Sequence, residues 1–192
     1  AVLIYLILGS VVTKIGFERK KLAGLAEARG GRRGPENVWG SAATGAILAI
    51  AYQANILDQK ILLIGFAASF CAKLADTFGS EIGKRWGGRT VLITSFRQVP
   101  AGTDGAISFV GTCSSAFGSL LMTFVMTFLF LDTLSPFALV LFVSGFLATL
   151  LESLLGALVQ NRFAWLTNEV INSLQTSVAA VIAMFFSSAI LK

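Results

Sequence analysis

The sequence predicts an all-α membrane protein, a polytopic helical bundle forming a single integral membrane domain over residues 1–192. Of its 192 residues, 55% are hydrophobic and only 13% are charged, and the mean hydropathy is +0.79. A soluble domain carries about a quarter charged residues. This chain has too few polar residues to cover a water-facing surface, so the lipid bilayer is its expected surroundings.

Six apolar runs approach the roughly 20 residues that a helix needs to cross a bilayer. These runs predict about six transmembrane helices, at 1–17, 38–54, 61–80, 107–131, 136–158 and 171–191.

Basic residues predict the orientation of these helices. They gather in the segments 14–36 and 84–97 and at Arg162, whereas the opposite connections hold only Asp58, Lys60 and Asp132. By the positive-inside rule the basic loops face the cytoplasm, or the stroma of a plastid. We therefore expect a bacterial inner membrane, a thylakoid membrane or a plastid membrane. The net charge of +5 is explained by this topology, and nothing else supports nucleic-acid binding.

The absence of histidine narrows the possible chemistry. With no histidine in the chain, a Ser-His-Asp or Cys-His nucleophile and any histidine-ligated metal are excluded. Cys71 and Cys113 lie far apart in apolar runs, so we expect both to be buried and inert. The remaining carboxylates, amides, hydroxyls and cations suit oxygen-liganded metal ions and phosphates.

Acidic residues lie at or near the predicted cytoplasmic ends of helices. Each one alone could reach water at the interface, but a carboxylate near hydrocarbon usually faces a polar cavity, a metal ion or a cation. Together they predict a site at the cytoplasmic face. They are Asp76, Glu81, Asp104, Glu152 and Glu169.

The segment 73–90 is the densest in candidate site residues. On a helix, Asp76, Gly79, Ser80 and Gly83 share one face. A ligand could approach this face closely, or Gly79 and Gly83 could simply pack against another helix. Glu81 lies well around the helix from Asp76, so it shares a metal with Asp76 only if the helix bends; otherwise it makes a different contact. Lys84 and Arg85 follow and suit phosphate oxygens.

A turn precedes the fourth apolar run. Pro100, Gly102, Thr103 and Gly105 expose backbone N–H groups that could hold a phosphate. Asp104 in this turn either caps the helix predicted from residue 107 or holds Mg²⁺.

Two further segments supply polar groups. Arg29, Arg32 and Arg33 could clasp a polyphosphate, or they could belong to a flexible basic loop. Glu152, Glu169 and Asn172 must be paired with each other or with a ligand, because they lie in or beside apolar helices.

Four segments resemble the phytyl-phosphate kinase family, membrane proteins of domain of unknown function 92. They are GLAEARGGRRGPENVWGSAATG at 24–45, ADTFGSEIGK at 75–84, TSFRQVPAGTDGAISFVGT at 94–112, and ESLLGALVQ with WLTNEVINSL within 152–174. The family is distantly similar to CTP-dependent phytol and polyprenol kinases.

The resemblance implies a Mg²⁺-dependent phosphotransferase that moves a phosphoryl group from CTP, or another nucleoside triphosphate, to phytyl monophosphate. The product, phytyl diphosphate, is an isoprenoid precursor in tocopherol biosynthesis. By position, Asp76, Glu81 and Asp104 match the family's acidic, catalytic positions. Lys84 and the turn from Gly102 to Gly105 match its phosphate-contacting positions.

The residues agree with that chemistry, since phosphoryl transfer depends on metal ions, cations and positioning. We expect Asp76 and Asp104 to hold the metal. The expected phosphate ligands are Lys84, Arg85, Arg29, Arg32, Arg33, Gly102, Thr103 and Gly105, with Glu152, Glu169 and Asn172 as an outer polar layer.

Other functions stay open at this point. The chain could phosphorylate the free alcohol, phytol or a polyprenol, or transfer a nucleotidyl group to a lipid phosphate. It could also be a small membrane transporter or an assembly subunit. A homodimer is possible.

Overall fold

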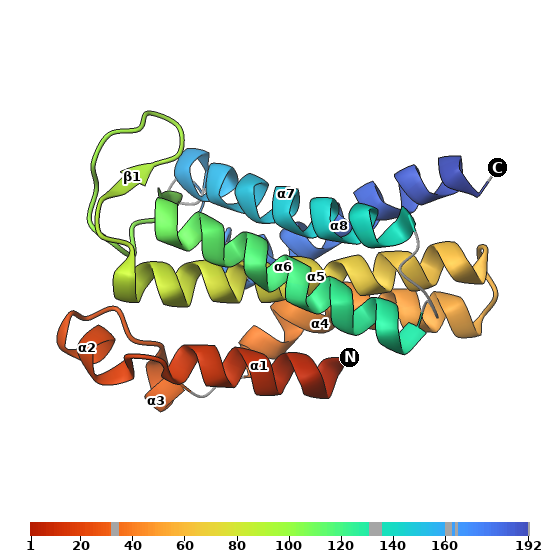
Figure 1. Ribbon diagram of the computed structural model, residues 1–192, viewed down its shortest axis with the longest axis horizontal. Coiled ribbons are helices and arrows are strands. Elements are labelled where there is room, and N and C mark those ends of the chain that lie inside the picture. Colours follow the sequence, from red (N-terminus) through yellow and green to blue (C-terminus); the bar gives the residue numbers. More distant parts are fainter. Residues whose placement is uncertain (32–34, 131–135, 160–162, 164, 192) are drawn as a thin grey trace.

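The computed structural model describes residues 1–31, 35–130, 136–159, 163 and 165–191. Within these ranges the chain is mostly helical, and its long helices run side by side as a bundle (Figure 1), which confirms the all-α prediction. The long helices are α1 (Val2–Lys14), α4 (Pro35–Gln53), α5 (Gln59–Trp86), α6 (Phe109–Phe130), α7 (Pro136–Leu158) and α8 (Asn168–Ile190). The short elements are α2 (Phe17–Leu22), α3 (Ala28–Gly31), β1 (Thr90–Leu92) and β2 (Ala106–Ser108).

Four of the described helices, α5 to α8, are long and apolar enough to cross a membrane. The other two predicted spans correspond to shorter apolar helices, Val2–Lys14 and Ala42–Gln53. At 1.5 Å per residue, α1 is about 20 Å long, less than the hydrocarbon core of about 30 Å.

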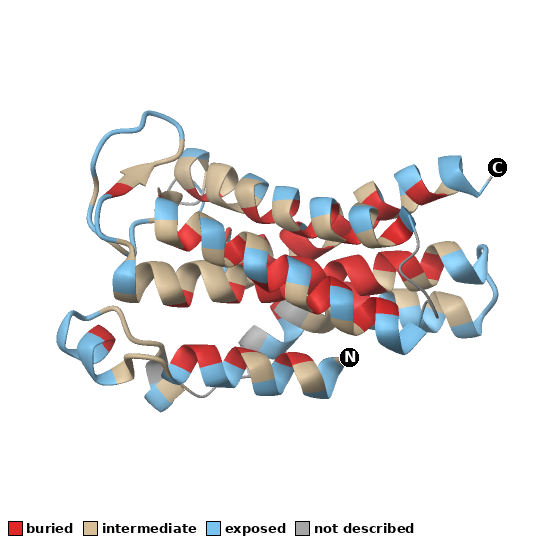
Figure 2. Cartoon of the chain, in the orientation of Figure 1, coloured by how far each residue is buried: buried red, intermediate tan, exposed pale blue. Residues whose placement is uncertain are grey.

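Helix α5 forms the centre of the bundle. It packs against α1, α4, α6, α7 and α8, and the run 67–75 is buried on all sides (Figure 2). This run is rich in alanine with one serine and one cysteine, and small side chains let neighbouring helices approach closely.

Glycines on α6 and α7 complete this close packing. A Cβ at Gly118 would lie 2.8 Å from the carbonyl oxygen of Leu74, and one at Gly145 would lie 2.8 Å from the Cβ of Cys71. Any larger side chain at either position would force its helix away from α5.

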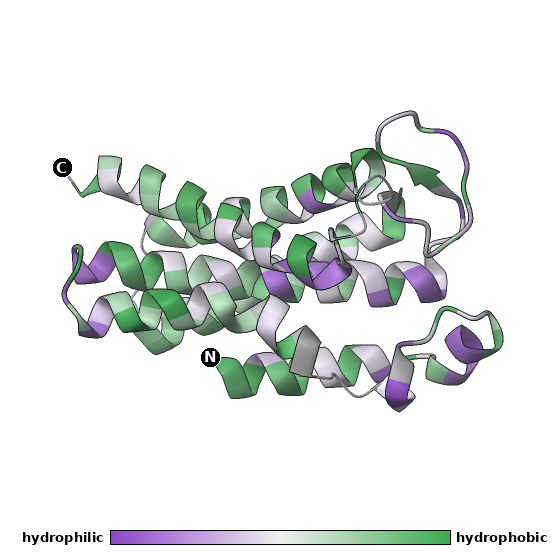
Figure 3. Ribbon diagram, turned by 180° about the vertical axis from the view of Figure 1, so that it is seen from behind, coloured by the Kyte–Doolittle hydropathy of each residue, from purple (hydrophilic) through white to green (hydrophobic). Residues whose placement is uncertain are grey.

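The bundle has two different ends. The short helix α2 and the β1–β2 hairpin lie at one end, together with the last turn of α7 and the first turn of α8 (Figure 1). The α4–α5 connection and both ends of the chain lie toward the other. Hydrophobic residues dominate the length of the long helices (Figure 3), as expected for an integral membrane protein. The cytoplasmic assignment of the basic end stays a prediction.

The segment between α5 and α6 differs from the prediction. Helix α5 continues to Trp86, so Lys84 and Arg85 lie on its last turn. Strands β1 and β2 then pair antiparallel, with Val91 opposite Ile107. Helix α6 begins only at Phe109.

The start of α6 excludes one interpretation of Asp104. The hydroxyl of Ser108 accepts a hydrogen bond from Gly111 N at 3.1 Å, so Ser108 caps α6. Asp104 lies before β2 and is not the helix cap.

The two cysteines differ in exposure. Cys71 is buried in the core as predicted, but Cys113 is exposed on α6. The prediction that both are buried is therefore wrong for Cys113, whose position falls on the outer face of its helix.

Candidate functional site

A cavity of about 230 Å³ opens at the end of the bundle that carries the β1–β2 hairpin. Helices α5, α6, α7 and α8 and the loop 101–108 surround it. Its lining includes Asp76, Gly79, Ser80, Gly83, Lys84, Thr90, Thr103, Asp104, Gly105, Ser108, Gly111, Thr112, Ser115, Thr149, Glu152, Ser153, Gly156, Asn168 and Ile171. Segments far apart in the sequence thus supply one polar-lined space.

The glycine face of α5 packs against α6 and also lines the cavity. A Cβ at Gly79 would collide with the hydroxyl oxygen of Ser115, and one at Gly83 would lie 3.4 Å from the Cα of Gly111. These glycines therefore pack α5 against α6. They also line the cavity, so the close packing exposes backbone beside Asp76.

The turn before β2 requires glycine at two positions. Gly102 and Gly105 have φ angles of 84° and 74°, a region that L side chains rarely adopt. A Cβ at Gly105 would lie 2.6 Å from the Cα of Ala157 on α7, and one at Gly102 would lie 2.8 Å from Leu25. The turn is thereby held between α7 and the segment after α2.

Hydrogen bonds within the turn fix its shape. The backbone N–H and the hydroxyl of Thr103 both donate to the carbonyl oxygen of Pro100, at 3.3 and 2.8 Å. Ala106 N donates to Thr103 O at 3.0 Å. This geometry places Asp104 on the wall of the cavity that Asp76 also lines.

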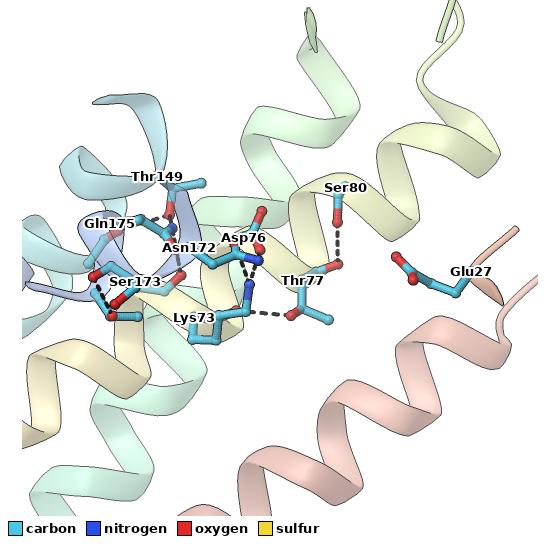
Figure 4. A network of polar contacts seen from close by, with 12 residues as sticks. Glu27, Lys73, Asp76, Thr77, Ser80, Thr149, Asn172, Ser173 and Gln175 are labelled. Carbon is cyan, nitrogen blue, oxygen red and sulfur yellow. Dashed lines mark hydrogen bonds and ion pairs between the residues drawn. The ribbon is translucent and has the colours of Figure 1, made fainter. Parts of the chain in front are cut away.

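Asp76 is held by a buried lysine. The ammonium of Lys73 donates to Asp76 Oδ2 at 2.6 Å and to Asn172 Oδ1 on α8 at 2.7 Å (Figure 4). The side chain of Lys73 is 3% exposed, whereas that of Asp76 is 20% exposed. Lys73 is therefore sealed in the bundle while Asp76 reaches the cavity.

Glu152 on α7 completes this cluster. Its carboxyl group lies within hydrogen-bonding reach of Asp76 and near the ammonium of Lys73. Gln175 supports the same region, because its amide donates to Thr149 Oγ1 at 3.0 Å and to Ala72 O at 3.1 Å. Two carboxyl groups in contact repel each other when both are ionised. The cluster therefore favours a bound cation or a shared proton.

No three-ligand metal site exists among the described residues, counting acidic and cysteine side chains. Carboxylates alone would therefore not complete the coordination of a metal ion in the cavity.

Comparisons with known proteins place the chain in a family. The family model "Integral membrane protein DUF92" matches residues 1–180. The chain belongs to this family. It is 44% identical over 186 residues to an uncharacterized membrane protein of Synechocystis, which covers 95% of this chain and 71% of that protein.

Two further relatives extend the comparison. The chain is 38% identical over 193 residues to Protein VTE6, chloroplastic, of Arabidopsis thaliana, covering 98% of this chain but 58% of VTE6. It is 33% identical over 180 residues to an uncharacterized membrane protein of Methanocaldococcus jannaschii, covering 94% of this chain and 72% of that one. No solved structure matches.

In this DUF92 protein Glu81 does not line the cavity. Five positions after Asp76, Glu81 is rotated by about 140° around α5, and it is 2% exposed. Its carboxylate pairs with the buried ammonium of Lys20 on α2, which also donates to Thr13 O at 2.8 Å. This is the different contact that the helix geometry left open, and a catalytic role for Glu81 has no geometric support.

The predicted phosphate-binding cations separate into two groups. Lys84 lines the cavity and lies 3.8 Å from Glu27. Arg85 does not line the cavity: it packs over Gly16 at the α1–α2 turn, with its guanidinium 4.8 Å from the ring of Trp86. Arg29 is exposed with a φ angle of 56° and is not part of the lining. Arg32 and Arg33 lie outside the described residues.

The outer polar residues also separate. Glu152 lines the cavity, and Asn172 reaches it through Lys73. Glu169 does not line it; a Cβ at Gly40 of α4 would lie 2.7 Å from the carbonyl oxygen of Glu169, so this residue packs α8 against α4.

Lys73, Thr149 and Gln175 were not identified from the sequence. A lysine within an apolar membrane helix, three residues before Asp76, was the available signal, because such a residue is costly to bury without a partner. Thr149 and Gln175 gave no signal, since uncharged polar residues are common in membrane helices.

Proposed function

We propose that this DUF92 protein is a membrane prenyl-phosphate kinase. It would transfer a phosphoryl group from CTP, or another nucleoside triphosphate, to phytyl monophosphate and so form phytyl diphosphate. One observation carries the proposal: Asp76, Asp104 and Lys84, from separate segments, line one cavity at the end of a membrane bundle. The resemblance to phytyl-phosphate kinases supplies the substrate class.

The size of the cavity fits phosphate groups. Its volume of about 230 Å³ is below the roughly 300–1,000 Å³ of common ligand pockets. The reacting phosphates would therefore occupy the cavity, while the nucleoside would remain on the aqueous side. The prenyl chain would lie among the apolar helices, since its phosphate is anchored at their polar end.

The donor set suits Mg²⁺. This ion is usually held in such sites by one or two carboxylates together with substrate phosphates and water, and the cavity is lined by the carboxyl groups of Asp76 and Asp104, with Glu152 beside Asp76. When bound, Mg²⁺ would neutralise charge on the transferring phosphoryl group. Lys84 would contact phosphate oxygens, and backbone N–H groups of the Gly102–Gly105 turn would do the same.

The proposed reaction needs no strong base. A phosphate oxygen of phytyl monophosphate attacks the γ-phosphorus of the triphosphate. The bond between that phosphorus and the β,γ-bridging oxygen breaks, and the nucleoside diphosphate leaves. Because the acceptor phosphate is already ionised at neutral pH, no proton has to be removed from it. The lack of histidine is therefore no obstacle.

A product assay on the purified protein tests the proposal. Phytyl monophosphate and free phytol are offered in parallel with Mg²⁺ and CTP, and the lipid products are identified by mass. We expect diphosphate from the monophosphate only. Monophosphate made from phytol would instead show an alcohol kinase. No product from either, with folded protein, would reject both kinase functions and leave transport or assembly, which liposome flux then tests.

A further inference from the structure

Lys73 has no part in the mechanism above, although it is the most deeply buried charge beside the cavity. Its side chain is 3% exposed, in a stretch of α5 where every residue from 67 to 75 is buried. Burying an ammonium costs several kcal/mol unless charges and hydrogen bonds compensate it. The hydrogen bonds of Lys73 supply that compensation.

Lys73 has polar neighbours on α5, α7 and α8, and Tyr5 on α1 also lies near its ammonium. Asp76 lies one turn further along α5, Asn172 lies on α8, and Glu152 on α7 lies near the ammonium. Figure 4 shows the ammonium between the carboxylate of Asp76 and the side chain of Asn172. Lys73 thus fixes the direction of Asp76 relative to both neighbouring helices.

The net charge of the cluster is the sum of the charges on Asp76, Glu152 and Lys73. Asp76 and Glu152 would contribute two negative charges when ionised, and Lys73 contributes one positive charge. The cluster therefore presents about one net negative charge to the cavity when both acids are ionised. A lysine at this distance weakens the attraction of the two carboxylates for a divalent cation while keeping them in place.

We infer that Lys73 is a positioning residue of the cation site: it aims Asp76 into the cavity and sets the net charge that Asp76 and Glu152 present to a divalent cation. The inference rests on the proposed function for its chemistry. By this inference Glu152 lies near the bound cation, in addition to Asp76 and Asp104. A lysine that only held the helices together would not set the affinity for a cation.

The effect of removing the Lys73 charge on divalent-cation affinity separates a charge-setting role from a packing role. Removing the positive charge should tighten the binding of a divalent cation, because a repulsion is lost. If Lys73 served packing only, its loss would loosen the cluster and weaken binding, or leave it unchanged. Mn²⁺ is a suitable probe, since its free and bound forms are distinguished by electron paramagnetic resonance.

The experiment compares Mn²⁺ affinity in detergent, in mildly alkaline buffer, without nucleotide or lipid. Lys73→Met should bind Mn²⁺ roughly threefold tighter or more, because the loss of charge repulsion outweighs the looser hold on Asp76. It should lose turnover, because phosphoryl transfer needs the Asp76 carboxylate in one fixed direction. Asn172→Asp reaches the same net charge with Lys73 retained, so it should also tighten binding even if Lys73→Met fails to fold. The double variant Lys20→Met, Glu81→Gln removes the other buried ion pair of α5 and should leave Mn²⁺ affinity unchanged.

The outcomes are distinct from those of the product assay. Tighter Mn²⁺ binding in the folded Lys73 or Asn172 variant supports the inference, even if the wild-type protein makes no diphosphate. Unchanged or weaker binding in every folded variant overturns it, even if the wild-type protein is an active kinase. Wild-type protein that binds no Mn²⁺ overturns it as well.

Discussion

Asp76 on α5 and Asp104 in the turn before β2 line the same cavity, although the last turns of α5, strand β1 and most of the loop between the two strands separate them along the chain. The two acids lie on different structural elements, so only the tertiary fold brings them to one cavity. The close contact of the turn with Ala157 on α7 brings Asp104 to the cavity, and Lys73 directs Asp76 toward it. Two carboxylates from separate segments thus line one polar space.

Asp76→Asn and Asp104→Asn should each lower phosphoryl transfer by roughly a hundredfold or more, because each removes a charge that stabilises the transferring group. The proteins should still elute as folded, monodisperse species in detergent. Asp58→Asn is the matched control, since Asp58 caps α5 at the opposite end of the bundle. Near-normal rates in both cavity variants would reject the metal assignment.

Glu81→Gln should affect stability more than chemistry. It leaves Lys20 charged in a site that is 1% exposed, and breaking a buried pair in this way costs about 3–5 kcal/mol. Thermal unfolding in detergent should show a clear loss of stability, seen as a lower midpoint temperature. The double variant Lys20→Met, Glu81→Gln removes both charges and should recover much of it.

Activity measured on the same variants separates the two roles of Glu81. The folded double variant should keep its rate of phosphoryl transfer. If that rate falls as far as in Asp76→Asn, while stability is recovered, Glu81 belongs to the catalytic site after all.

The fold was largely predictable because its signals are local. Apolar runs such as 136–158 coincide with helices, since length and hydropathy are properties of a single segment. Basic residues predicted which connections share one end. The boundary between α5 and α6 was less predictable, because β1 and β2 are only three residues each and depend on pairing with each other.

The site was predictable only in part because its contacts are distant in sequence. Asp76, Asp104, Lys84 and Glu152 were identified as polar groups out of place in a membrane. Asn172, one of the partners of Lys73, lies 99 residues away, and the partner of Glu81 lies 61 residues away. A helical pattern could show that Glu81 faces away from Asp76, but it could not supply Lys20.

Gly105→Ala should disturb the turn that carries Asp104. The substitution adds strain at a φ angle of 74° and a clash with Ala157 on α7. We expect a higher KM for the nucleotide and a lower kcat, measured by the product assay.

Gly88→Ala is its control, because Gly88 also has a positive φ angle, 60°, but has no atom within 4 Å of an added Cβ. It should cost only about 1–2 kcal/mol of strain and leave KM unchanged. Equal effects of the two substitutions on KM and kcat would show that backbone strain, and not the contact of the turn with α7, causes the change.

Lys84 and Glu27 provide a test of the phosphate assignment. Their charged groups lie 3.8 Å apart, and the side chains are 23% and 42% exposed, so the pair stabilises the fold by less than about 1 kcal/mol. Glu27 competes with a phosphate for the ammonium of Lys84. Glu27→Gln should therefore lower the KM for the nucleotide about twofold, an effect that fades as salt screens the charges.

Lys84→Gln should raise the KM for the nucleotide at low salt, whereas Lys60→Gln at the opposite end of the bundle should not. If KM is unchanged in both Glu27→Gln and Lys84→Gln, Lys84 does not contact phosphate, and the backbone of the Gly102–Gly105 turn becomes the remaining candidate for that contact.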